Sequence, residues 1–133
     1  TCDVLGAFFI GLITAVICFV MVAYVKPKLK YDDTLDAFGV HGVGGIIGSI
    51  LTGVFATRVI TGESGAQGAL YGDWHQLWIQ IIATLASIVY SAVLTAILFY
   101  IVNKTIGLRA TKQDESDGLD VSQHGEIAYC ENE

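Results

Sequence analysis

Charged side chains are scarce in this sequence of 133 residues: 15% are Asp, Glu, Lys or Arg, whereas 53% are hydrophobic. A soluble domain of this size needs more polar surface than that composition supplies. The uncharged residues are concentrated in three long runs, which favours membrane-spanning helices over a large soluble core. The composition therefore predicts an all-α membrane protein.

Cysteine is also rare, with three residues at Cys2, Cys18 and Cys130. Their spacing fits no zinc-binding pattern, and an odd number does not indicate a disulfide framework. Cys18 lies inside an apolar run, where a thiol behaves as a small hydrophobic group. We therefore predict no metal site and no cofactor from the cysteines.

The sequence lacks an initiator methionine and the charged first region of a signal peptide, because it begins Thr1-Cys2-Asp3. We therefore expect an interior segment of a longer protein or a trimmed form of one. The net charge is −6, but seven of the thirteen acids follow residue 104. The acidity belongs mainly to a polar C-terminal tail, and it gives no indication of a nucleic-acid partner.

The three apolar runs cover residues 5–25, 37–56 and 77–102. A membrane-spanning helix needs about 20 residues, and the third run is long enough to require tilt or a projecting end. We expect Pro27 to end the first span, and Asp36 or Thr34 to cap the second. The sequence thus predicts a transmembrane region over 1–104 and a tail over 105–133.

The second span holds one ionisable residue, His41, among closely spaced glycines. A titratable ring in hydrocarbon is costly, which makes it a functional-site hypothesis. The glycines let another backbone approach closely. On a helix, His41 shares a face with Gly45, Gly48 and Thr52, while the bulky isoleucines lie opposite. We expect the histidine face to meet protein and not lipid.

Two further polar features are less specific. His75 lies next to Tyr71, Trp74 and Trp78, an aromatic group typical of the membrane interface. A stripe of hydroxyl and amide residues follows the third span, and it could bond across helices or back to its own carbonyls. This stripe comprises Gln80, Thr84, Ser87, Ser91 and Thr95. His41 and His75 should lie at different depths, so we expect neither a shared metal nor an enzyme active site.

Basic residues predict the orientation. Six of them lie on one side if the three spans alternate, namely Lys26, Lys28, Lys30, Lys104, Arg109 and Lys112. Arg58 alone lies on the other side. Positive residues favour the cytoplasm, so a multi-pass protein of the cell membrane with a cytoplasmic tail is expected.

Two stretches resemble a known family. The first is Asp36-Ala-Phe-Gly-Val-His41-Gly-Val-Gly-Gly45, followed by Thr52-Gly53-Val-Phe-Ala56. The second is Gly107-Leu-Arg109, followed by Gly118-Leu-Asp-Val-Ser-Gln-His-Gly-Glu-Ile-Ala-Tyr129. In this order, with one span between them, they resemble the second pore-histidine segment and the tail of the Amt branch of the Amt/Rh ammonium transporter family. The resemblance covers essentially the whole chain, but about the last third of the family's usual length.

The resemblance implies a homotrimer with a substrate pore through each subunit, built from about eleven spans in two inverted halves. It implies that His41 is the second of two pore histidines, with Ala37 lining the pore. Gly42, Gly45 and Gly48 would belong to the same pore helix, with Asp36 in a structural role. The first histidine would lie in spans outside this sequence.

The tail of this family is implied to contact the neighbouring subunit and, in prokaryotic members, the trimeric nitrogen-signal protein PII. The residues that carry this motif are Gly107, Arg109, Gly118, Asp120, Ser122 and His124. A phosphate on Ser122 would alter docking through its charge. The implied function is ammonium or ammonia transport; the alternative is an ammonium-sensing or regulatory scaffold that acts through its tail.

Overall fold

The computed structural model describes residues 1–126, and three of its helical segments are long and apolar enough to cross a membrane. These segments are Val4–Leu29, Phe38–Phe55 and Trp74–Thr105. They confirm the prediction of an all-α membrane protein with three spans. Cys130 and the end of the predicted tail, residues 127–133, lie outside the described residues.

The first span combines α1 (Val4–Val20), the π-helical turn η1 (Met21–Val25) and α2 (Lys26–Leu29). Asp3 begins it, because its carboxylate accepts a hydrogen bond from the Gly6 N–H at 2.7 Å. The prediction that Pro27 ends this helix was wrong. Pro27 lies in the first turn of α2, where a missing N–H is tolerated, and the wider turn η1 precedes it. The helix instead ends at Leu29, and the residue that follows it, Lys30, is left-handed with φ at +52°.

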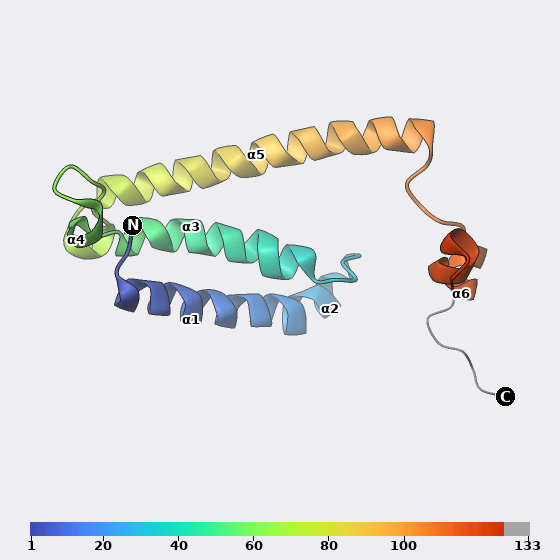
Figure 1. The fold of residues 1–133 in the computed structure, drawn as a ribbon, viewed down its shortest axis with the longest axis horizontal. Coiled ribbons are helices and arrows are strands. Elements are labelled where there is room, and N and C mark those ends of the chain that lie inside the picture. The colour runs from blue at the N-terminus through green and yellow to red at the C-terminus, as the bar shows by residue number, and fades with distance from the viewer. Residues whose placement is uncertain (127–133) are drawn as a thin grey trace. The chain divides into compact units, whose positions relative to one another are not determined.

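The second span consists of the π-helical turn η2 (Phe38–Gly42) and α3 (Val43–Phe55). It runs antiparallel to α1, and the two helices lie side by side (Figure 1). Glycine makes the approach possible: a Cβ on Gly6 would lie 3.2 Å from the Cβ of Phe55. The Phe55 ring also stacks on Phe9, with ring centroids 6.3 Å apart.

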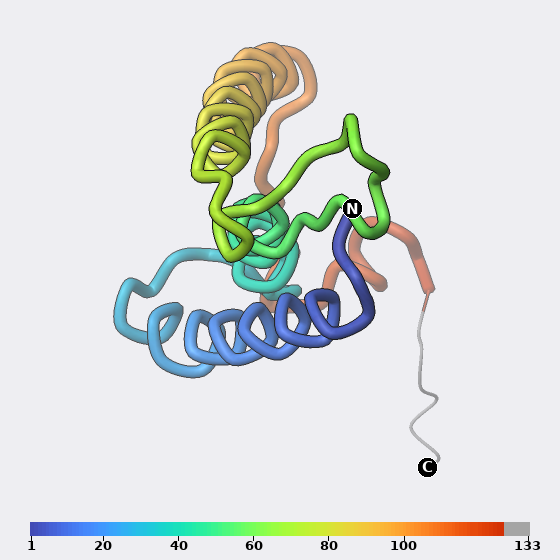
Figure 2. The backbone as a smooth tube through the Cα atoms, turned by 90° about the vertical axis from the view of Figure 1, so that its left-hand side faces the viewer, coloured from blue at the N-terminus to red at the C-terminus, as the bar shows by residue number. Residues whose placement is uncertain are grey.

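The chain's first residues pair with the segment that follows α3 (Figure 2). Cys2 and Ala56 form an isolated antiparallel bridge, and the Thr57 N–H donates to the Thr1 carbonyl at 2.9 Å. The Gly68 N–H donates to the Ala56 carbonyl at 2.8 Å. Ala56 and Thr57 are buried as a result. This junction therefore ties the start of the first span to the end of the second.

The predicted connection after α3 contains two short helices, α4 (Arg58–Thr61) and η3 (Ala69–Tyr71). The third span, α5 (Trp74–Thr105), follows, and the Asp73 carboxylate accepts from the His75 N–H at its start. Gly53 of α3 meets this end of α5, since its Cβ would lie 3.0 Å from the Leu77 Cα. α5 continues into a second compact unit, residues 91–133. That unit also holds α6 (Lys112–Asp117) and the π-helical turn η4 (Asp120–His124).

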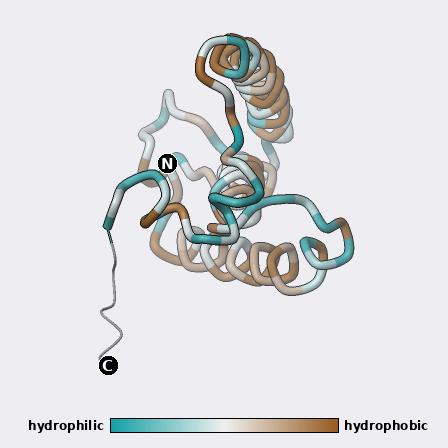
Figure 3. The backbone as a smooth tube through the Cα atoms, turned by 90° about the vertical axis from the view of Figure 1, so that its right-hand side faces the viewer, coloured by the Kyte–Doolittle hydropathy of each residue, from teal (hydrophilic) through white to brown (hydrophobic). Residues whose placement is uncertain are grey.

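Large hydrophobic side chains remain exposed along all three spans. Phe8 is 60% exposed, Trp78 61% and Phe99 58%. Figure 3 shows hydrophobic residues recurring along α1, with hydrophilic ones gathered in the turn between α2 and η2. Burial of such apolar surface is favourable, so these faces require lipid or further protein around them.

Candidate functional site

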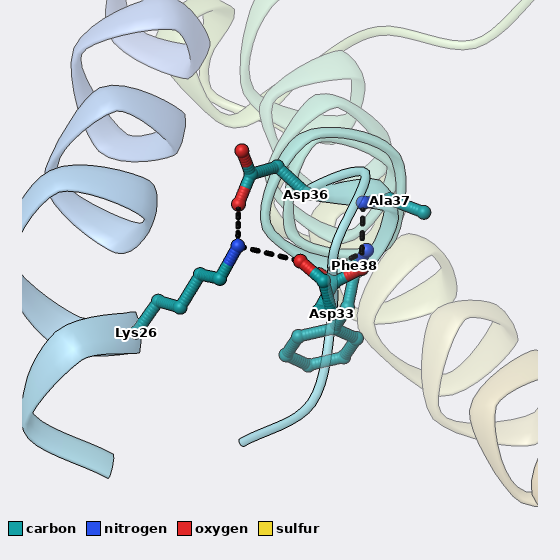
Figure 4. A network of polar contacts seen from close by, with 5 residues as sticks. All are labelled: Lys26, Asp33, Asp36, Ala37 and Phe38. Carbon is teal, nitrogen blue, oxygen red and sulfur yellow. Dashed lines mark hydrogen bonds and ion pairs between the residues drawn. The ribbon is translucent and has the colours of Figure 1, made fainter. Parts of the chain in front are cut away.

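The helix that carries His41 begins in a loop whose acids have separate structural tasks (Figure 4). The Asp33 carboxylate accepts hydrogen bonds from the Ala37 N–H at 2.9 Å and from the Phe38 N–H at 3.0 Å. Asp33 therefore satisfies two backbone donors that have no partner within the helix. Neither Asp36 nor Thr34, the predicted caps, makes these bonds.

Asp36 instead faces the end of the first span. Its carboxylate forms an ion pair with the Lys26 ammonium, whose Nζ also donates to the Asp33 carbonyl; both distances are 2.5 Å (Figure 4). The backbone of Asp36 is left-handed, with φ at +55°, a region that residues other than glycine rarely adopt. One lysine thus holds two points of the loop, on either side of Thr34 and Leu35.

His41 lies in the π-helical turn η2, where the Val43 N–H bonds to the Phe38 carbonyl five residues earlier. Such a turn carries one extra residue relative to an α-helix, and it is often found at functional sites. Within the turn, the Phe38 ring lies edge-on to the Tyr31 ring, with centroids 5.9 Å apart. A Cβ on Gly42 would lie 2.9 Å from that Phe38 ring.

The first span packs directly against the turn. The thiol of Cys18 donates to the Val40 carbonyl, with sulfur and oxygen 3.6 Å apart. A Cβ on Gly39 would lie 2.9 Å from the Val22 side chain, and one on Gly44 would lie 3.2 Å from the Cys18 sulfur. These glycines allow the close approach that the sequence pattern predicted.

The His41 side of the helix is uncovered within the first compact unit, residues 1–90. His41 is exposed, and so is Ala37. A Cβ on Gly45 or Gly48 would meet nothing within 4 Å. The expectation that this face meets protein is therefore not met within residues 1–90. Small side chains leave room for a closely packed neighbour beside the imidazole.

The Thr52 hydroxyl, on the same helix as His41, is satisfied within its own helix. It donates to the Gly48 carbonyl at 2.8 Å, one helical turn back, and so leaves no unsatisfied donor. On α5, no hydrogen bond joins Gln80, Thr84 or Ser87 of the predicted polar stripe to another helix within residues 1–90. The buried Thr84 hydroxyl of that stripe has no hydrogen-bond partner.

His75 is separated from His41 by the length of α3. His41 precedes α3, whereas His75 begins α5, beside the last turns of α3 at Gly53. Gly53 follows His41 by 12 residues of helix. That length spans about 18 Å, too far for one metal ion. Within the described residues, no group of three His, Cys, Asp or Glu side chains could hold a metal ion.

The tail residues singled out from the sequence belong to the second unit. Gly107 and Gly118 have φ values of +81° and +92°, which glycine adopts without strain. Arg109 forms an ion pair with Glu115 at 3.0 Å. The Ser122 hydroxyl donates to the Gly118 carbonyl, and Asp120 and His124 begin and end η4. These contacts give the tail a local fold of its own.

Three residues of the His41 region were missed by sequence reasoning. Asp33 carried a signal, because aspartate is a preferred cap and precedes the apolar run. Lys26 carried no signal for its ion pair, which joins residues ten apart and depends on how the loop folds. Cys18 was predicted as a simple hydrophobic residue, and its bond to the Val40 carbonyl requires the packing of two helices.

Comparison with known proteins agrees with the resemblance. The family model described as the Ammonium Transporter Family matches residues 1–129. An ammonium transporter of Aquifex aeolicus is 48% identical over 127 residues, and one of Bacillus subtilis is 47% identical over 120 residues. Ammonium transporter Amt1 of Archaeoglobus fulgidus is 39% identical over 127 residues.

These alignments cover 96%, 90% and 96% of this chain, respectively. They cover 29%, 30% and 32% of the three relatives. The chain therefore spans about a third of the length of the curated relatives it matches. Since the family model extends over nearly all of its residues, the chain belongs to the ammonium transporter family.

Proposed function

We propose that this chain forms part of a path for ammonium or ammonia across the cell membrane, with His41 as a pore residue and Ala37 lining the pore beside it. The observation that carries the proposal is the uncovered face at His41, in a chain of this family. An imidazole flanked by Gly45 and Gly48 is open to a small molecule, and no side chain of residues 1–90 fills the space at those glycines.

The chemistry of the imidazole suits this substrate. Moving an intact ammonium ion through an apolar path would remove its hydration shell at great cost. If ammonium gives a proton to a ring nitrogen of His41, neutral ammonia and an imidazolium result, and the ammonia crosses the apolar stretch. The imidazolium then passes its proton onward and returns to the neutral form.

The test is His41→Ala in the gene product that carries these residues, reconstituted into liposomes. We expect the ammonium-evoked current to fall by roughly 100-fold, the lower range for loss of a positioned proton-transfer group. His75→Ala is the matched control and should retain the current. Equal currents in wild type and His41→Ala, at equal protein incorporation, would overturn the proposal.

We further propose that residues 105–133 form a cytoplasmic regulatory tail and that the complete protein is a homotrimer. Lysine-rich ends of the spans support this orientation. PII is the proposed partner of the tail, through Arg109 and the segment from Gly118 to His124. Binding of PII to the membrane-embedded protein, compared with an Arg109→Ala variant, tests the contact; binding without any ammonium current in the wild type would favour a regulatory scaffold instead.

A further inference from the structure

We propose that Lys26 and Asp36 are positioning residues for His41: their ion pair holds the left-handed turn from which the π-helical turn η2 starts, and so sets the direction of the imidazole. The proposal rests on the proposed function of His41. In this proposal the end of the first span orients His41 through the Lys26–Asp36 pair, and neither charge could do so without the other.

The first step of the argument is that η2 does not define its own geometry. A π-helical turn is less regular than the α-helix that follows it, and it persists where its surroundings require it. Here the surroundings act at three points: Asp33 binds the Ala37 and Phe38 N–H groups, the Tyr31 ring contacts Phe38, and the Cys18 thiol binds the Val40 carbonyl.

The second step concerns Asp36, which lies between the cap and the turn. Its φ of +55° is unfavourable for a residue with a side chain, and such a conformation persists when neighbouring contacts determine it. The Asp36 N–H bonds to the Asp33 carbonyl at 3.1 Å, and the Val40 N–H bonds to the Asp36 carbonyl at 2.9 Å. A rotation at Asp36 would therefore move Val40 and the neighbouring His41.

The third step is the reach of Lys26. Its ammonium binds the Asp36 carboxylate and also the Asp33 carbonyl, the same carbonyl that accepts from the Asp36 N–H. The side chains of Lys26 and Asp36 are 25% and 33% exposed, so the pair is partly shielded from water. An exposed ion pair generally contributes little to stability, but this one closes a loop of ten residues onto a fixed helix end. Figure 4 shows the lysine reaching from α2 into that loop.

The decisive variants separate the charge from the backbone conformation. Asp36→Gly keeps the left-handed φ accessible but removes the carboxylate, and Lys26→Gln removes the ammonium. Lys26→Arg keeps a positive charge of similar reach. Lys28→Gln is the matched control, because Lys28 lies in the same lysine cluster and makes no contact with Asp36 in the structure.

The first readout does not depend on transport. Diethyl pyrocarbonate modifies accessible neutral imidazoles, and peptide mass spectrometry reports His41 and His75 separately in the same sample. We expect the modification rate at His41 to change several-fold in Lys26→Gln and Asp36→Gly, with His75 unchanged. Lys26→Arg should restore most of the wild-type rate, and Lys28→Gln should match the wild type.

The second readout is the ammonium current of the full gene product in liposomes. A misdirected imidazole should lower the maximal current in Lys26→Gln and Asp36→Gly, while the half-saturating ammonium concentration stays the same. If Lys26→Gln fails to fold, Asp36→Gly and Lys26→Arg still give both readouts.

The outcomes distinguish the two proposals. An unchanged rate at His41 together with an unchanged maximal current in Lys26→Gln and Asp36→Gly would overturn the positioning role, even with a full current in the wild type. Equal changes at His41 and His75 would also overturn it, because they would indicate general loosening. Absence of current in the wild type would count against the proposed transport function, and the chemical modification would still decide whether the pair positions His41.

Discussion

The thiol of Cys18 donates to the carbonyl oxygen of Val40, the residue immediately before His41, at a distance of 3.6 Å. This contact brings the last turn of α1 against the π-helical turn of the second span. It also places the same sulfur 3.2 Å from where a Cβ on Gly44 would lie. The first span therefore packs against the helix beside the histidine, at Val40 and Gly44, and the neighbouring glycines Gly44 and Gly45 have different tasks.

The first prediction concerns the packed side. Gly44→Leu would force its side chain against Cys18 and Thr14, whose methyl carbon lies 3.6 Å from the Cβ position. Overpacking of this kind costs about 1–3 kcal/mol, so the thermal unfolding midpoint in detergent should fall. Gly44→Ala, with a single added methyl group, should have a smaller effect. An unchanged midpoint for Gly44→Leu would show that α1 and α3 do not pack in this way.

The second prediction concerns the open side. Gly45→Leu adds a side chain where the described residues leave space, beside the proposed pore histidine. We expect it to block most of the ammonium current by narrowing the path, with a smaller fall in unfolding midpoint than Gly44→Leu shows. The two variants are one residue apart and have the same added volume. If Gly45→Leu conducts normally, the path does not run along this face.

The spans could be predicted from the sequence because they depend on the length of apolar runs, a property that needs no tertiary contact. The residues at which the spans end were harder to predict. Pro27 was expected to end the first helix, but the preceding π-helical turn accommodates it and the helix reaches Leu29. Such a turn has no simple sequence signature, because it depends on how the helix packs.

His41 could be singled out because an ionisable residue in an apolar run is rare and costly. The residues that hold its helix turn in place could not be singled out. Asp33 caps the helix in place of the predicted Asp36 or Thr34, and the ion pair of Asp36 with Lys26 forms only when the loop folds back on the first span. The histidine face is open within residues 1–90, and its neighbours depend on tertiary contacts that no local pattern encodes.

The third prediction tests the junction between the chain's first residues and the end of α3. A Cβ on Gly68 would overlap the Val54 carbonyl oxygen, a backbone atom that cannot move aside as a side chain would. Gly68→Ala should therefore destabilise the protein by about 3 kcal/mol, in the range of backbone strain and overpacking. The midpoint of chemical unfolding in detergent measures this loss of stability.

Gly11→Ala is the control for that experiment, since a Cβ there meets nothing within 4 Å. Gly11 lies inside α1, where alanine is the better helix former by about 1 kcal/mol. It should leave the unfolding midpoint unchanged or raise it. Similar midpoints for Gly68→Ala and wild type would mean that the segment after α3 does not return to the Ala56 carbonyl as the structure has it.

The fourth prediction separates the cap found in the structure from those expected from the sequence. Asp33→Ala removes the carboxylate that binds the Ala37 and Phe38 N–H groups, which should cost about 1 kcal/mol, the typical value for a lost N-terminal cap. Asp33→Asn keeps an acceptor oxygen and should cost less. Thr34→Ala should cost little, because the Thr34 side chain makes none of these bonds. Thermal unfolding of the three variants gives the order directly, and a larger loss for Thr34→Ala than for Asp33→Ala would assign the cap to Thr34. Because the capped N–H groups lie within four residues of His41, Asp33→Ala should also lower the ammonium current more than its stability loss alone accounts for, whereas Thr34→Ala should leave the current unchanged.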